Sequence, residues 1–174
     1  MVNTPEQLSE SLENYVEAIF HIETKKHAAR AKDIAERLKV SNSSVTGALR
    51  LLSEKGLVNY APYDIITLTS KGKAIARDVV HRHTTLRDFF VKILSIDEPD
   101  AEEAACKMEH GVSPIVLNRL TQFIEFLETC PQGSFQWLEK FNAYCEHGNL
   151  PAHCQECRAQ GIEDMQPHWA NKSK

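Results

Sequence analysis

The sequence predicts a mainly helical protein: an N-terminal winged helix-turn-helix, a helical domain after it, and a short Cys-rich C-terminal extension. Three observations lead to this prediction. Apolar residues recur at helical spacing along the chain, two short β-rich runs stand between residues 57 and 68, and four cysteines follow residue 129. At 174 residues with 42% hydrophobic content, the chain can bury one sizeable core or two small ones without disulfides.

The N-terminal part has the order of elements expected of a winged helix-turn-helix. Two short helices meet at a tight polar turn, Gly56 supplies the left-handed residue that ends the second of them, and a small hairpin follows as the wing. The expected helices are 6–24, 31–38 and 43–55, and the expected strands are 57–60 and 65–68.

Three further helices are expected beyond the wing. Ser70 is expected to cap a long helix that reaches about Leu94, and an acidic helix spans 97–110. Ser113-Pro114 starts a helix to about Thr129, because an N-cap serine followed by proline at the first helical position is a strong start. The predicted domains are 1–74 (winged helix-turn-helix), 75–130 (helical domain), 131–160 (Cys/His-rich extension) and 161–174 (flexible tail).

Charge is segregated along the chain, although the formal net charge is only −4. Residues 25–77 contain eleven Lys or Arg against four Asp or Glu, so a basic module precedes an acidic remainder. A basic helix-turn-helix predicts a DNA partner, with small polar side chains at a helix N-terminus approaching bases and cations contacting phosphates. The expected DNA-binding residues are Arg30, Lys32, Ser41, Asn42, Ser43, Ser44, Thr46 and Arg50, with Lys71 and Lys73 as further phosphate contacts.

Composition also indicates where the protein works. The first ten residues are polar and acidic and no run of roughly 18 apolar residues occurs, so we predict a cytoplasmic protein with no membrane partner. In that compartment thiols stay reduced, and the five cysteines are better candidates for metal ligands or buried thiols than for disulfides.

A metal site is suggested on the acidic helix. Cys106, Glu109 and His110 are spaced i, i+3 and i+4, which places a thiolate, a carboxylate and an imidazole on one face. This triplet alone is also compatible with a buried cysteine and two surface residues. Possible partners lie upstream, namely His81 and His83 on the long helix and Asn14 and Glu17 on the first helix. An ion bound by all three helices would tie the DNA-binding module to the second domain, and so act as a switch.

Taken in order, several segments resemble the diphtheria-toxin-repressor family, which includes the manganese-transport regulators. The resemblance runs from about Leu8 to Leu127. It rests on 13–19 (ENYVEAI), 33–38 (DIAERL), 43–46 (SSVT), 55–58 (KGLV), 68–73 (LTSKGK), Arg82-His83 and Cys106-x-x-Glu109-His110. It implies a homodimeric repressor, metallated by Fe²⁺ or Mn²⁺, whose second domain binds metal and dimerises, and which binds a palindromic operator of metal-uptake genes.

The family's ligands fall on particular positions of this chain. The resemblance implies Asn14, Glu17, His83, Cys106, Glu109 and His110, with Glu102 as an accessory ligand. Asn14 departs from the family, which has a carboxylate or a thioether there. The thiolate of Cys106 favours softer, later metals, so Fe²⁺ is the first choice, while Glu17 and His83 match the manganese members and keep Mn²⁺ open. Gly47 stands where relatives present a long polar side chain to a base.

The C-terminal extension departs from the family and has its own metal-binding pattern. Cys130, Cys145, Cys154 and Cys157 follow C-x14-C-x8-C-x2-C, with His147 and His153 interspersed, which is ligand spacing for Zn²⁺ or an iron-sulfur cluster. The aromatic residues between 135 and 144 would form a small helical cover for it. A cysteine-containing tail without metal is the alternative.

Two rival functions follow from these patterns. A redox-sensing transcription regulator would use the C-terminal zinc or iron-sulfur site as its sensor. A metallohydrolase would use His83, Cys106, Glu109 and His110 around an open coordination position. The sequence contains no nucleophile motif or phosphate loop, so we predict neither an enzyme nor a small organic substrate.

Overall fold

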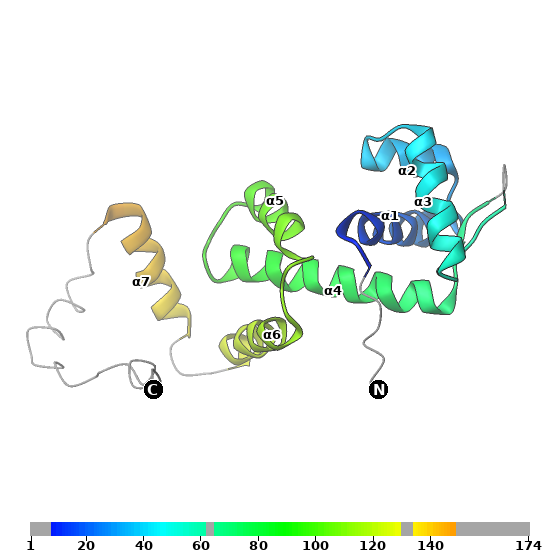
Figure 1. Cartoon of the computed structure of the whole chain (residues 1–174). Helices are drawn as coiled ribbons and strands as arrows, with labels where there is room; N and C mark the ends of the chain where they lie inside the picture. Colours follow the sequence, from blue (N-terminus) through cyan, green and yellow to red (C-terminus); the bar gives the residue numbers. More distant parts are fainter. Residues whose placement is uncertain (1–7, 62–64, 130–133, 149–174) are drawn as a thin grey trace, which may run out of the picture.

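The computed structural model describes residues 8–61, 65–129 and 134–148, and it is mainly helical (Figure 1). Seven helices and two short strands are present in that part of the chain. In order, they are α1 (Glu10–Lys26), α2 (Ala31–Leu38), α3 (Asn42–Glu54), β1 (Val58–Asn59), β2 (Thr67–Leu68), α4 (Ser70–Lys92), α5 (Glu98–Met108), α6 (Pro114–Thr129) and α7 (Ser134–His147).

The N-terminal elements confirm the predicted winged helix-turn-helix. Helices α2 and α3 are separated by residues 39–41, with Lys39 in the left-handed region at φ 54°. Gly56 follows α3 at φ 67°, as expected of a glycine that ends a helix. The strands pair antiparallel with Val58 opposite Leu68, and Ile66 forms an additional bridge to Ala29. The paired part of the wing is therefore shorter than the two four-residue runs predicted.

Helix α4 begins at Ser70 and its N-cap is Thr69, so the expectation that Ser70 caps this helix was wrong by one residue. The Thr69 hydroxyl accepts a hydrogen bond from the Gly72 N–H at 3.1 Å and donates to the Gly56 carbonyl at 2.8 Å. A threonine at this position satisfies one orphan donor of the helix and also fastens the end of α3 to the start of α4.

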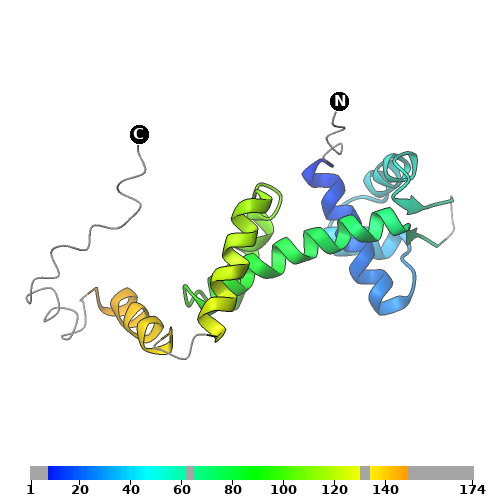
Figure 2. The same cartoon turned by 90° about the horizontal axis from the view of Figure 1, so that it is seen from below.

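Two hydrophobic cores lie along α4. The larger one joins α1, α2, α3 and the wing, and includes Ala76 from the first half of α4. The smaller one joins Leu86 and Phe90 of α4 to Ala101 and Ala105 of α5. Figure 2 shows α4 running as one continuous helix from the helix-turn-helix to the second core. A single rigid element thus connects the two parts of the described chain.

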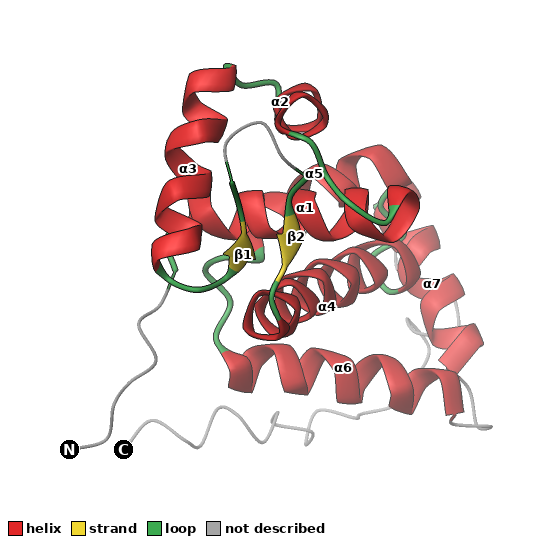
Figure 3. Ribbon diagram, turned by 90° about the vertical axis from the view of Figure 1, so that its right-hand side faces the viewer, coloured by secondary structure: helices red, strands yellow, loops and turns green. Residues whose placement is uncertain are grey.

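Around the second half of α4, α5 and α6 lie on opposite sides of it (Figures 1 and 3). Helix α6 turns Leu117 and Ile124 inward, and α7 is set apart at the far end of the molecule (Figure 1). Among the helices of the described residues, none combines the length and the apolar character that a membrane span requires.

Candidate metal centre and DNA-binding face

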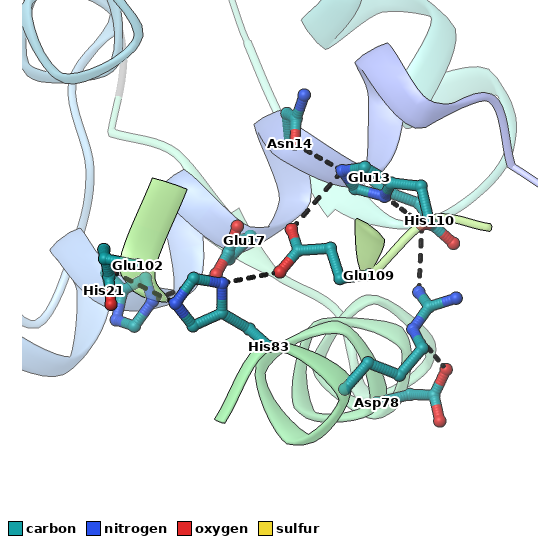
Figure 4. Close-up of polar contacts among 10 residues, drawn as sticks. Glu13, Asn14, Glu17, His21, Asp78, His83, Glu102, Glu109 and His110 are labelled. Atoms are coloured by element: carbon teal, nitrogen blue, oxygen red, sulfur yellow. Dashed lines mark hydrogen bonds and ion pairs between the residues drawn. The ribbon is translucent and has the colours of Figure 1, made fainter. Parts of the chain in front are cut away.

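The candidate metal centre lies where α1, α4 and the end of α5 meet (Figure 4). Helical spacing on α1 places Asn14 and Glu17 one turn apart on the side that faces α4, and α4 contributes His83. Glu109 is the C-cap of α5, which ends at Met108, and His110 follows it, so the helix is shorter than the predicted 97–110. Residues far apart in the sequence are therefore brought together between the two hydrophobic cores.

Glu109 has no exposed surface, and its two carboxylate oxygens face different neighbours. Its Oε2 accepts a 2.7 Å hydrogen bond from His83 Nδ1. Ligand atoms of Glu17, His83 and Glu109 all lie within 4.8 Å of one another. On the other side of the imidazole, His83 Nε2 lies 3.1 Å from Glu102 Oε1. Glu17, His83 and Glu109 thus form a compact group that Glu102 borders.

The second oxygen of Glu109 faces His110 and Asn14. His110 Nε2 lies 2.8 Å from Asn14 Oδ1 and 3.3 Å from Glu109 Oε1 (Figure 4). Although this Oε1 is buried, it receives no well-directed hydrogen bond from the described residues. Nδ1 of His110 points the other way, 2.7 Å from Glu13 Oε2.

These atoms suit a divalent cation. Donors in neighbouring positions around an ion with bonds of about 2.1 Å are about 3 Å apart, close to the spacings among His110, Asn14 and Glu109. A buried carboxylate oxygen without a hydrogen-bond donor is costly unless a positive charge meets it. The residues present therefore fit a bound metal. Glu109 can contribute to it on both sides, because one of its oxygens lies beside His83 and the other beside His110.

The carboxylates of the site stabilise positive charge, whether it is a proton on His83 or a cation beside it. The hydrogen bond to Glu109, with help from Glu102, raises the pKa of His83 to about 9 although burial opposes this. Burial alone would raise the pKa of Glu17, but a hydrogen bond from His21 and nearby positive charges bring it below its ordinary value. Burial and the neighbouring carboxylates raise the pKa of the Cys106 thiol. This thiol therefore needs a cation beside it to ionise near neutral pH.

An open cleft of about 780 Å³ leads to this centre. Five of the seven predicted ligands line it, namely Asn14, Glu17, His83, Glu102 and Cys106, and Glu109 contacts the cleft residue His83. His110, the seventh, contacts Asn14. The helix-turn-helix reaches the same cleft through Arg37 and Leu38 of α2.

The structure also shows which neighbours sequence reasoning missed or misplaced. His81, expected as an upstream partner beside His83, is exposed and does not line the cleft. His21 lies 3.4 Å from Glu17, a contact that the i, i+4 spacing on α1 could have indicated. Glu13 and Arg82, which pair at 2.9 Å beside His110, carry no local sequence signal because they come from different helices.

The predicted DNA-binding face is the N-terminal part of α3. Ser41 is the N-cap and its Oγ accepts from the Ser44 N–H at 3.2 Å. The hydroxyls of Ser43 and Ser44 lie 2.8 and 2.9 Å from the Ser41 hydroxyl, and Thr46 donates to the Asn42 carbonyl at 2.9 Å. Residues 41–44 are exposed, so this polar helix start is open to a partner.

The cations predicted to contact phosphates lie at the start of α2 and in α3 and α4. The side chains of Arg30, Lys32 and Arg50 are exposed. Lys73, in contrast, pairs with Glu23 of α1 at 2.7 Å, and Lys71 donates to the Lys55 carbonyl at 3.4 Å. Those two lysines hold α4 against α1 and the end of α3, whereas Arg30, Lys32 and Arg50 remain the predicted phosphate contacts whose residues are exposed.

The C-terminal cysteine pattern falls almost entirely outside the described residues. Outside the described residues lie Cys130, Cys154, Cys157, His153 and the predicted tail. Cys145 is described and is an exposed thiol on α7. The zinc or iron-sulfur site remains a prediction from the sequence.

Comparison with known families places this geometry in context. The family model described as "Iron dependent repressor, N-terminal DNA binding domain" matches residues 7–65. The one described as "Iron dependent repressor, metal binding and dimerisation domain" matches residues 69–138. The chain belongs to the iron-dependent repressor family. This is the diphtheria-toxin-repressor family that the sequence resembles, and its members are metal-dependent transcriptional repressors.

Relatives of this repressor family agree in sequence and fold. The chain is 39% identical over 119 residues to the uncharacterized HTH-type transcriptional regulator MJ0568 of Methanocaldococcus jannaschii, covering 68% of this chain and 95% of that one. It is 35% identical over 118 residues to the HTH-type transcriptional regulator MntR of Bacillus subtilis, covering 68% and 82%. These relatives are named as regulators and not as enzymes.

Solved structures show the same fold. The manganese regulator SloR superposes with a TM-score of 0.60 at 27% identity, covering 70% of this chain and 57% of SloR. A manganese-dependent transcriptional repressor in complex with manganese has a TM-score of 0.58 at 29% identity, covering 66% and 53%. The matched region thus covers little more than half the length of these two proteins.

Proposed function

We propose that this iron-dependent repressor family member is a homodimer that binds a palindromic operator of metal-uptake genes when a divalent cation fills the centre between its two cores. Asn14, Glu17, His83, Cys106, Glu109 and His110 would hold the ion, and Glu102 would border it. The resident ion supplies positive charge that offsets the repulsion of the converging carboxylates.

One observation carries this proposal: the acceptor atoms come from α1 of the DNA-binding module and from α4 and α5 of the second module. Glu17 and Asn14 lie on α1, and their partners His83, Glu109 and His110 lie beyond the middle of α4. The full ligand set exists only while α1 stays beside His83 of α4 and beside Glu109 and His110, which follow α5. Ion binding therefore favours that arrangement of the helix-turn-helix over any in which the two modules move apart.

Fe²⁺ is the proposed physiological ion, with Mn²⁺ as the alternative. Cys106 lines the cleft beside the carboxylates and supplies a soft ligand, which favours iron over manganese. Two carboxylates, two imidazoles and an amide oxygen also suit Mn²⁺. Co²⁺ and Zn²⁺ should bind at least as tightly as Fe²⁺ in a purified sample, so the cellular supply of ions decides occupancy.

The second copy of the chain is proposed to dock on α6, which lies within the residues matched by the dimerisation domain. Helix α6 is apolar on two sides. Leu117 and Ile124 face inward, whereas Ile115 and Phe126, three turns apart, are 72% and 60% exposed. Sedimentation velocity should show a dimer for the parent chain and a monomer for Ile115→Glu or Phe126→Glu. A dimer retained by both variants would exclude this surface.

DNA binding tests the proposed switch. The purified protein is incubated anaerobically with a randomised DNA pool under three conditions: with chelator, with Fe²⁺ and with Mn²⁺. DNA selected in this way is then used for affinity measurements. We expect binding with one or both ions and none with chelator. The rival redox function predicts binding that ignores both ions and changes with the oxidation state of the protein.

Variants of the centre then test the ligand assignment. His83→Ala and Glu109→Ala should abolish metal-dependent DNA binding while the fold, followed by circular dichroism, is kept. His81→Ala is the matched control, because His81 is an exposed histidine on the same helix two residues away. Metal dependence that persists in both ligand variants would refute the assignment.

A further inference from the structure

Glu13 is a buried carboxylate that the proposed ligand set does not use. It is only 8% exposed, although it lies on α1 directly before the proposed ligand Asn14. Its Oε2 accepts a 2.7 Å hydrogen bond from Nδ1 of His110 (Figure 4). A carboxylate is rarely buried without a partner, so this contact calls for a role beyond packing.

Arg82 of α4 holds the same oxygen. Its Nη2 lies 2.9 Å from Glu13 Oε2, and both side chains are about one-tenth exposed. Neither Nη2 nor Nε of Arg82 forms a well-directed hydrogen bond within the described residues. Attraction between charges, more than hydrogen-bond direction, therefore secures the pair, and it balances the charge of Glu13 inside the protein.

The position of Glu13 decides which nitrogen of His110 is available to a metal. A neutral imidazole carries its proton on one nitrogen and offers a lone pair on the other. With the Nδ1–H donated to Glu13, the lone pair is on Nε2, the atom that faces Asn14 and Glu109. Carboxylates that hold the second nitrogen of a metal-bound histidine fix its tautomer and ring orientation.

We infer that Glu13, held by Arg82, is the positioning residue of His110 and turns its Nε2 toward the metal centre. The inference rests on the proposed function, because it assigns Glu13 a role toward that centre. These two contacts, Arg82 with Glu13 and Glu13 with His110, connect α4 through α1 to the end of α5. The orientation of a ligand from the second module thus depends on a side chain of the DNA-binding module.

The test replaces Glu13 by leucine, which removes the acceptor, and by glutamine, which keeps a weaker one. Glu10→Gln is the matched control, because Glu10 is an exposed carboxylate on the same helix, three residues before Glu13. Long-range proton–nitrogen spectra of metal-free protein, at a pH where the ring is neutral, report the tautomer of His110, assigned with His110→Gln. Calorimetry then gives the Mn²⁺ and Co²⁺ affinities.

We expect the Nδ1–H tautomer in the parent and control proteins. Glu13→Leu should populate the Nε2–H tautomer and bind both ions roughly 10–100-fold more weakly, and Glu13→Gln should show a smaller change in the same direction. An Nε2–H tautomer in the parent protein, or an unchanged tautomer and affinity in the variants, would overturn the inference. The glutamine variant alone decides if the leucine variant does not fold.

Failure of this inference can be told apart from failure of the proposed function. If His83→Ala and Glu109→Ala leave both affinities unchanged, the proposed centre is wrong, while the tautomer of the metal-free protein still decides whether Glu13 positions His110. If those two variants lose metal and the Glu13 variants keep both the tautomer and the affinity, only the positioning role is wrong.

Discussion

Replacing Gly72 by alanine is expected to destabilise the protein, whereas the same replacement at Gly47 is expected to stabilise it. Both glycines lie in helices with negative φ, so neither is required by a left-handed backbone. They differ in their surroundings. A Cβ on Gly72 would lie 2.1 Å from the Leu57 carbonyl oxygen and 3.2 Å from Leu68 Cδ2, while a Cβ on Gly47 would meet nothing within 4 Å.

The expected loss of stability in Gly72→Ala follows from the contacts of Leu57. Relief of the contact needs a movement of about 1 Å in a closely packed interior. The Leu57 carbonyl accepts from the Thr69 N–H at 3.0 Å and the Thr69 hydroxyl at 3.2 Å, so this movement would pull the N-cap of α4 with it. Overpacking and a weakened cap together should lower the free energy of unfolding by about 3 kcal/mol. Gly47→Ala should raise it by about 1 kcal/mol, the helix-propensity difference.

Thermal and urea unfolding of the two variants, measured on metal-free protein, provide the assay. For a chain of this size, a loss of about 3 kcal/mol lowers the melting temperature by roughly 6–12 °C. The two variants should therefore move in opposite directions from the parent. If both variants stay within about 0.5 kcal/mol of the parent, the close approach of α4 to Leu57 does not limit stability, and the reasoning fails.

Three further outcomes are expected. Arg50→Ala should weaken binding to any duplex and reduce the slope of log affinity against log salt by about 0.9, measured by fluorescence anisotropy; an unchanged slope would remove Arg50 from the phosphate contacts. Cys106→Ser should lower Zn²⁺ and Co²⁺ affinity more than Mn²⁺ affinity in competition titrations, because it replaces a soft ligand by a hard one, and equal losses would contradict that role. Leu49→Ala, at a fully buried position, should cost about 2–5 kcal/mol in urea unfolding, and a loss below about 1 kcal/mol would contradict its place in the core.

The sequence predicted the elements of the fold well because their signals are local. Ser113-Pro114 and Gly56 mark helix boundaries through their own backbone preferences, and α6 starts and α3 ends where they indicated. The N-cap of α4 was assigned to Ser70 in place of Thr69 because both residues can cap a helix. Contacts of Thr69 with the Gly56 and Leu57 carbonyls, thirteen and twelve residues away, distinguish them, and residues so distant along the chain leave no local signal.

The candidate site could be predicted only in part. The spacing of Cys106, Glu109 and His110 is visible in the sequence because the three residues lie within one turn of each other at the end of α5. Glu13 and Arg82 lie far from His110 along the chain, and their contact depends on how α1 and α4 pack, which periodicity does not specify. For the same reason sequence spacing favoured His81 and His83 equally, while the rotation of α4 turns only His83 toward Glu109.

The continuity of α4 fixes the number of residues between the two modules. Ala76 belongs to the first core and His83 to the candidate centre, and an unbroken helix joins them. One residue inserted between them would turn everything beyond it by about 100° around the helix axis and shift it by about 1.5 Å. His83 would then face away from Glu17 on α1. Natural variation in the length of this protein should therefore be confined to its loops and ends, while the number of residues between Ala76 and His83 stays constant.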